Sequence, residues 1–506
     1  MLSRPGPRSP WLRNVRLTPQ HRLLNHFITH PAEPIPPPAA PASSSPNPKP
    51  FTLAVKDNIA TTSPNLPTTC ASGILSRSYT SPIEATIIGQ LRARGAVITG
   101  KTNLDEFGMG SHSIYSHYGP VTQDNPPETS AGGSSGGSAV AVANGEVELA
   151  LGTDTGGSVR LPAAYTGIIG YKPSYGMISR YGVIPYANSL DTVGFLSRQI
   201  DPIKELIVGE RGLWKEHDRN DPTSLTEAVR KRCAAQRKGY RSQQGQTTEL
   251  KGLKFGIPLE YNIAELDLTI RDAWAAAAKR LQDVGARVVP VSLPTTKHAL
   301  AAYYVIAPAE ASSNLAKYDG IRYGVRDTDA PSDAAAGGVL YASTRGEGFG
   351  EEVKRRILLG SYTLSSEAMD NYFIKAQRVR RLVRRDFNRV FALDDPLQER
   401  VTFELSDLPE EVEMEDKWGP EEVDFLLCPT APTLAPKLKE VMEKQPVDAY
   451  MNDVFTVPAS LAGLPAISIP MKVTREGAAG LQLIGQYWDD ARLLDVAGAV
   501  ATELRT

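Results

Sequence analysis

The apolar positions of the chain alternate between two periods. FTLAV at 51–55 and AVIT at 96–99 are short β-like runs, whereas the segment between them places Ile87, Ile88 and Leu91 on one helical face. The runs SAVAVAN and ELALGT continue the alternation. Strands that alternate with helical patterns predict an α/β domain whose sheet is covered by helices.

A second round of the same alternation begins near the middle of the chain. KGLKFGIP at 251–258 is followed by an Ala-rich helical pattern over 269–284 and then by the strand-like ARVVPVSL. Residues 228–246 are basic and polar, and residues 394–424 are dense in Asp and Glu. We interpret both stretches as inserted, solvated surface loops rather than sites.

The N-terminal region differs from the rest of the chain. Residues 1–30 are rich in Arg and contain no Asp or Glu, which is typical of a mitochondrial transit peptide and predicts a matrix location. A disordered basic tail is the alternative. Residues 31–50 are rich in Pro and Ser and are expected to form a spacer, so the predicted domain spans 51–506. No apolar run approaches the ~18 residues of a membrane-spanning helix, and no membrane contact is expected.

The composition of the chain limits the classes of function that it can have. A chain of 506 residues can form about three domains or one large α/β domain. Lys and Arg total 55 against 57 for Asp and Glu, a net charge of −2, so no global positive field attracts nucleic acid. The 3 Cys and 7 His show neither C-x-x-C nor H-E-x-x-H spacing. We therefore expect no disulfide scaffold and no metal site.

Residues 95–102, GAVITGKT, match the phosphate-binding pattern G-x-x-x-x-G-K-[ST]. A phosphate-binding loop needs a strand before its first glycine and a flexible turn between the two glycines. Here a helical pattern comes first, and the intervening AVIT consists of strand formers. The segment is predicted to be a helix followed by a strand, not a nucleotide site.

The densest unusual chemistry lies within residues 130–160. Two Gly-Gly-Ser turns, at 132–138 and 156–158, flank apolar runs that do not suit a flexible linker. Consecutive backbone N–H groups in such a turn converge on one point and suit an oxyanion. The candidate oxyanion hole comprises the amides of Thr155, Gly156, Gly157 and Ser158.

A serine nucleophile such as Ser158 needs a base, and Lys56 is the best candidate. It follows the strand-like FTLAV, and a lysine within an apolar segment is uncommon on packing grounds alone. Burial lowers the pKa of a lysine from its ordinary ~10.4, so that the neutral amine can accept a proton. An ion pair with Asp57 or another acid is the alternative role for Lys56.

Three motifs resemble the amidase signature family: AVKDNI at 54–59, GGSSGGSAVAVA at 132–143 and LGTDTGGSVRLPA at 151–163. The similarity runs from about residue 51 to the C-terminus. It implies the fold of that family, a mixed central β-sheet covered by helices on both faces. It also implies catalysis through a seryl acyl-enzyme.

The resemblance assigns a triad of two serines and a lysine. By position, Ser158 would be the nucleophile, Ser134 the bridging serine and Lys56 the base. In the family the bridging serine follows a cis peptide bond, which falls here between Gly133 and Ser134.

Further segments are similar to one group within the family, the glutaminase members that serve tRNA-dependent amidotransferases; GKTNLDEFGMGS at 100–111 and FTVPASLAGLPAISIP at 455–470 are two of them. This similarity implies that Tyr303, Arg356 and Asp453 bind glutamine. The arginine and the aspartate supply one charge each for the α-carboxylate and the α-ammonium.

The same similarity implies a division of labour in mitochondrial translation. This chain would release ammonia from glutamine for the conversion of Glu-tRNA(Gln) to Gln-tRNA(Gln). It would need no cofactor of its own, because a B-type kinase and transamidase subunit would hold ATP and Mg, and a small accessory subunit of C or F type would complete a heterotrimer. A stand-alone amidase acting on small or lipid amides and a non-catalytic scaffold are the alternatives.

Overall fold

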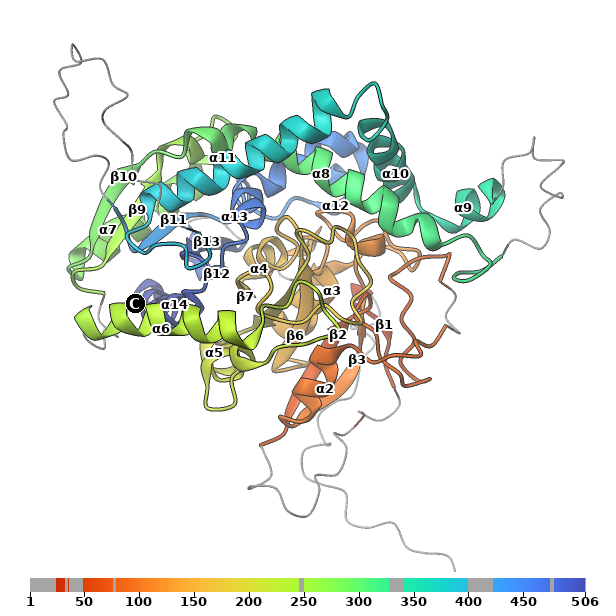
Figure 1. The fold of residues 1–506 in the computed structure, drawn as a ribbon, viewed down its shortest axis with the longest axis horizontal. Helices are drawn as coiled ribbons and strands as arrows, with labels where there is room; N and C mark the ends of the chain where they lie inside the picture. Colours follow the sequence, from red (N-terminus) through yellow and green to blue (C-terminus); the bar gives the residue numbers. More distant parts are fainter. Residues whose placement is uncertain are drawn as a thin grey trace, which may run out of the picture.

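A computed structural model describes residues 24–31, 35, 49–75, 79–124, 126–244, 250–326, 341–398, 422–473 and 477–505. Within these residues an 11-stranded mixed sheet crosses the molecule in the order β1-β3-β2-β6-β8-β7-β12-β13-β11-β9-β10. Helices α8, α10 and α11 lie on one side of it and α5, α6 and α14 on the other (Figure 1). The predicted mixed α/β fold is confirmed.

The bounds of the elements are as follows. The strands are β1 Phe27–Thr29, β2 Phe51–Lys56, β3 Ala96–Thr102, β4 Thr122–Asp124, β5 Pro127–Ser130, β6 Leu149–Asp154, β7 Ile169–Lys172, β8 Thr192–Ser197, β9 Lys254–Pro258, β10 Arg287–Val291, β11 Phe425–Pro429, β12 Ala466–Met471 and β13 Ala479–Ile484. The helices are α2 Thr86–Arg92, α3 Gly136–Ala143, α4 Arg160–Thr166, α5 Ile200–Val208, α6 Glu227–Gln244, α7 Leu268–Asp283, α8 Ala299–Asn314, α9 Ala342–Gly348, α10 Glu351–Thr363, α11 Lys375–Val390, α12 Leu438–Glu443, α13 Val457–Ala462 and α14 Asp490–Arg505.

The sheet brings two distant chain segments to one edge. β2 pairs in parallel with both β3 and β6, in the register Val55 to Leu151 with β6. Because parallel strands run in the same direction, their carboxyl ends meet at the same edge of the sheet. Lys56 ends β2 and Asp154 ends β6, and the turn 155–158 continues directly from there into α4.

The segment that matches a phosphate-binding loop is part of this sheet. Residues 96–102 form β3, and α2 precedes Gly95 as the sequence predicted. Lys101 is fully buried, with its Nζ 3.2 Å from Asp57 Oδ1 and donating to the carbonyl of Ile59 at 2.9 Å. This lysine therefore forms a buried ion pair in place of a phosphate contact.

The interpretation of residues 228–246 as a surface loop is wrong for most of that stretch. Residues 227–244 form α6, and its Arg230, Cys233 and Arg237 are buried on one face at spacings of three and four. Arg230 donates to the carbonyls of Gly176 and Met177, each at 3.0 Å. The basic composition of this stretch predicted exposed side chains. The guanidinium of Arg230 can be buried because backbone carbonyl oxygens accept its hydrogen bonds.

The sheet also begins earlier than the predicted domain start at residue 51. β1 pairs antiparallel with β3, and the Phe27 ring packs where Gly100 has no side chain, 2.9 Å from the position a Cβ would take. Residues 1–23 of the predicted transit peptide, most of the predicted spacer and residues 399–421 of the acidic stretch lie outside the described residues. Among those described, no helix is both long enough and apolar enough to cross a bilayer.

Candidate active site

The end of β2 meets the first Gly-Gly-Ser turn. Lys56 is fully buried, and its Nζ lies 2.7 Å from Ser134 Oγ and 2.8 Å from Ser135 Oγ. The peptide bond between Gly133 and Ser134 is cis, as the resemblance implies. The structure thus joins Lys56 to the predicted bridging serine across 78 positions of sequence.

Burial makes the amine of Lys56 a weak base. Removal from water lowers its pKa from 10.5 to about 7, even though the carboxylates of Asp105 and Asp154 oppose the change. At neutral pH a large fraction of the amine is therefore uncharged. In that form it can accept a proton from the hydroxyl of Ser134.

Ser158 lies on the turn that joins β6 to α4. Its carbonyl accepts a hydrogen bond from the Ser135 N–H at 3.1 Å, which ties the two Gly-Gly-Ser turns together. Ser158 is 8% exposed, whereas Lys56 and Ser134 are both at 0%. Of these three residues, Ser158 is the one that reaches solvent and could meet a substrate.

The turn 155–158 is held from both of its ends. The carboxylate of Asp154 pairs with Arg160 at 2.8 Å, and Arg160 also donates to the carbonyl of Thr456 at 2.9 Å. A side chain at Gly157 would lie 2.3 Å from Thr456 Oγ1, so only glycine fits there. In the part of the chain that the structure describes, the amides of residues 156–158 have no acceptor. They remain available to an oxyanion.

Arg356 lies on the inner side of α10, inside a group of tyrosines. Its Nε donates to Glu352 Oε1 at 2.8 Å and its Nη1 to Tyr186 Oη at 2.6 Å, while its Cζ lies 5.4 Å from the ring centroids of both Tyr304 and Tyr450. Nη2 has no partner among the described residues. The guanidinium is thus fixed in place with one donor edge free for an anion.

Asp453 ends the short helical segment η9, Pro446–Asp453. Its Oδ2 accepts from Ser111 Oγ at 2.9 Å and from Tyr304 Oη at 3.1 Å. Its Oδ1 lies 3.3 Å from the position a Cβ on Gly157 would take, so the carboxylate borders the turn of Ser158. Burial raises its pKa to about 7, and a cation bound beside it would be stabilised by the ionised form.

The comparisons with known proteins agree with this geometry. A family model described as Amidase matches residues 51–494. The chain belongs to the amidase family. This amidase is 89% identical over its full length to the A subunit of the mitochondrial glutamyl-tRNA(Gln) amidotransferase of Podospora anserina, with 100% of each chain covered. It is 66% identical to the protein of the same name from Neurospora crassa, with 90% of each chain covered.

A solved structure supports the same assignment. The A subunit of the glutamyl-tRNA(Gln) amidotransferase of Thermotoga maritima matches with a TM-score of 0.68 and 33% identity, covering 94% of this chain and 87% of that one. The family predicted from the three motifs, and the enzyme class that goes with it, are therefore confirmed. The roles of individual residues stay predictions that rest on their geometry.

Of the three predicted substrate-binding residues of the amidase, Tyr303 and Asp453 border the turn of Ser158, and Arg356 is linked to Asp453 through Tyr304. The ring of Tyr303 packs on Gly156, with Cζ 2.6 Å from the position a Cβ would take. Sequence reasoning missed Tyr304, which contacts both Arg356 and Asp453. Glu352 could have been found, because it precedes Arg356 by four residues on a helix. Tyr186 and Tyr450, which also surround Arg356, come from distant segments, and no sequence pattern pointed to them.

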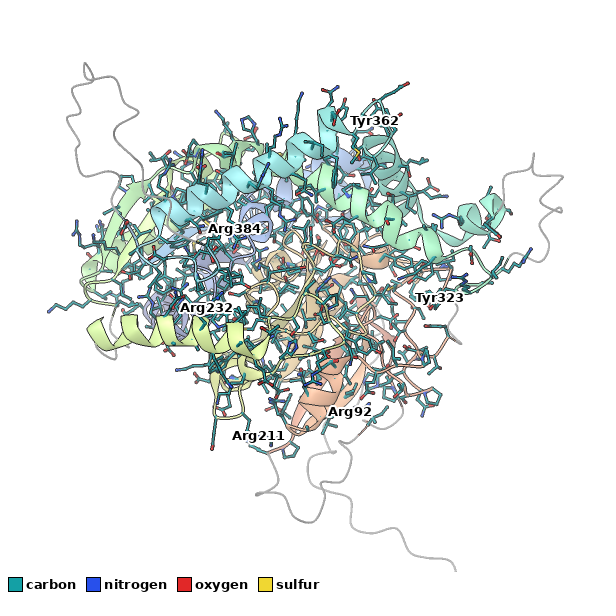
Figure 2. The ribbon with its side chains drawn as sticks, viewed as in Figure 1. Arg92, Arg211, Arg232, Tyr323, Tyr362 and Arg384 are labelled. Atoms are coloured by element: carbon teal, nitrogen blue, oxygen red, sulfur yellow. The ribbon has the colours of Figure 1, made fainter. Side chains whose placement is uncertain are left out.

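Figure 2 shows the opposite side of α10. Tyr362, near the end of this helix, points away from the molecule and is 58% exposed. Arg356, on the same helix, is 3% exposed. The helix therefore turns one face to the site and the other to solvent.

Proposed function

We propose that this amidase is the glutamine-hydrolysing A subunit of a mitochondrial glutamyl-tRNA(Gln) amidotransferase. The observation that carries the proposal is the pair Arg356 and Asp453, two opposite charges that both contact Tyr304 beside the turn of Ser158. The α-carboxylate and α-ammonium of glutamine require one charge of each sign. A small or lipid amide without charges would leave the free Nη2 donor of Arg356 unbonded and the negative charge of Asp453 without a bound cation, which is unfavourable.

The proposed reaction begins with proton transfer. Neutral Lys56 accepts the proton of Ser134, which in turn accepts that of Ser158, and Ser158 Oγ attacks the side-chain amide carbon of glutamine. The amides of the predicted oxyanion hole, Thr155, Gly156, Gly157 and Ser158, stabilise the resulting oxyanion. The C–N bond then breaks, and the proton returns through Ser134 to the nitrogen, which leaves as ammonia. Water hydrolyses the remaining ester and releases glutamate.

The assembly and the compartment are part of the same proposal. The relatives are named as A subunits and as mitochondrial, which supports a complex in mitochondria, and the Arg-rich leader favours the matrix. In that complex a B-type subunit would hold ATP, Mg and Glu-tRNA(Gln), and a C- or F-type subunit would complete the assembly. A net charge of −2 accords with a chain that leaves the tRNA to its partner.

The test uses the reconstituted complex and two nitrogen donors. Ser158→Ala should lower glutamine-dependent amidation of Glu-tRNA(Gln) by at least ~10³-fold, because the nucleophile is lost. Ammonia-dependent amidation should stay at the wild-type rate, because it bypasses this site. Ser81→Ala, a buried serine outside the site, is the matched control.

Two outcomes would contradict the proposal. Undiminished glutamine-dependent amidation by Ser158→Ala would exclude this serine as the nucleophile. Hydrolysis of hexanamide by the isolated chain at a higher kcat/KM than glutamine would favour a stand-alone amidase.

A further inference from the structure

Residues 105–115, which we call the Asp105 loop, hold the turn that carries Ser134. The Asp105 N–H donates to the Ser134 carbonyl at 3.3 Å. The hydroxyl of Ser113 donates to the Gly132 carbonyl at 2.8 Å and accepts from the Gly136 N–H at 3.0 Å. Ser113 therefore forms hydrogen bonds to the residues on both sides of the Ser134 turn.

The same loop holds the proposed ammonium-binding carboxylate. Ser111 Oγ donates to Asp453 Oδ2 at 2.9 Å. The ring of His112 lies 2.8 Å from Ser130 Oγ through Nδ1 and 3.0 Å from Asn452 Nδ2 through Nε2. The Asp105 loop thus contacts Ser134 on one side and the η9 segment on the other.

The carboxylate of Asp105 fixes the shape of this loop. It is fully buried and accepts the amides of Ser113 at 2.8 Å, Ile114 at 2.9 Å and Tyr115 at 3.0 Å. A side chain at Gly133 would lie 2.2 Å from its Oδ2. Both oxygens therefore face N–H donors, and the backbone before Ser134 packs directly against the carboxylate.

The charge of Asp105 also acts on Lys56. Among the carboxylates that raise the pKa of Lys56 it has the largest effect, ahead of Asp154 and Asp191. Burial raises the pKa of Asp105 itself to about 6, so it is mostly ionised at neutral pH. A negative charge at this place favours the protonated amine, the form that returns the proton to the leaving nitrogen.

We propose that Asp105 is the positioning residue of this site. Its carboxylate fixes the loop that holds the Ser134 turn and Asp453 in place, and its negative charge stabilises the protonated amine of Lys56. Asp105 touches neither the substrate nor the reacting atoms in the proposed reaction. The inference rests on the proposed function only where glutamine is the substrate, since the arrangement of Lys56 and Ser134 does not depend on it.

The first experiment measures how fast phenylmethylsulfonyl fluoride inactivates the full chain as a function of pH, a reaction of Ser158 that needs no glutamine. Asp105→Asn should slow inactivation by ~10-fold, because the amide NH₂ opposes a loop N–H. It should also move the midpoint of the pH profile below that of the wild type, because loss of the negative charge lowers the pKa of Lys56. An unchanged midpoint would overturn the proposal, whether or not the rate falls.

The second experiment separates the two contacts of the loop without changing charge. Ser113→Ala should lower kcat for glutamine about fivefold with little change in KM, because only the Ser134 turn is released. Ser111→Ala should raise KM about fivefold with little change in kcat, because only Asp453 is released. Equal effects of both variants on kcat and KM would overturn the proposal, and these variants decide it if Asp105→Asn does not fold.

A matched control and the wild type distinguish the possible failures. Asp218→Asn removes another buried carboxylate, one that accepts from Thr86 and Ser179 away from the site, and should leave rates and midpoint unchanged. Wild-type inactivation without any glutamine hydrolysis would overturn the proposed substrate but would leave the role of Asp105 supported by the first experiment.

Discussion

Burial moves the pKa values of two residues of the site toward neutrality for the same physical reason. Burial disfavours the charged form of each group, so it lowers the pKa of Lys56 to about 7 and raises that of Asp453 to about 7. The proposed reaction needs a neutral lysine and an ionised aspartate. Both states are populated above this pH and are lost together below it.

The pH dependence of glutamine hydrolysis follows from these signs. As the pH falls below about 7, Lys56 gains a proton and stops acting as a base, and Asp453 gains a proton and stops binding an ammonium group. The slope of log(kcat/KM) against pH should therefore approach two on the acidic side. Asp453→Asn should raise KM at least ~10-fold and reduce the slope to one. A slope of two in that variant would contradict the role of Asp453.

At the scale of elements, periodicity predicted strands and helices wherever one face is apolar. β2, α2, β3, α7 and β10 form where the sequence placed them. α6 was missed because its buried face includes two arginines, and composition alone cannot tell a solvated arginine from one whose donors meet backbone carbonyls. That distinction depends on the loops packed against the helix.

The anchoring of α6 predicts a difference between two of its arginines. Arg230 is buried and donates to four backbone carbonyls and to Ser224 Oγ, whereas Arg232 is exposed on the same helix. Arg230→Ala should lower the free energy of unfolding by about 2–4 kcal/mol, because several buried carbonyls lose their donor. Arg232→Ala should change it by less than about 0.5 kcal/mol. Denaturant unfolding of both variants checks this, and equal losses would show that α6 is not anchored by Arg230.

At the scale of the whole molecule, the 55 basic and 57 acidic residues nearly balance, which argues against strong tRNA binding by this chain alone. Affinity for a phosphate backbone comes mainly from clustered positive charge and the release of counterions. A chain with a net charge of −2 has no overall excess of positive charge to contribute. The proposed complex therefore requires a partner that holds the tRNA.

This balance predicts that the isolated chain binds tRNA poorly. At ~150 mM salt its Kd for tRNA should be weaker than the ~10⁻⁴ to 10⁻⁶ M typical of non-specific nucleic-acid binding. The reconstituted complex should bind Glu-tRNA(Gln) at least tenfold more tightly in the same filter-binding assay. Tight, salt-sensitive binding by the chain alone would contradict the proposed division of labour.

The sequence by itself determined the family and the local chemistry. Each of the motifs around Lys56, Ser134 and Ser158 is an unbroken stretch of sequence. Their glycines and serines show which turns can present amides and hydroxyls. Only the tertiary structure decided how these turns meet the rest of the site. The parallel pairing of β2 and β6 brings Lys56 to the edge where the turn of Ser158 begins. The local pattern placed this lysine in an apolar segment, but only packing at that edge removes it fully from water, and this burial lowers its pKa far enough for it to act as a base.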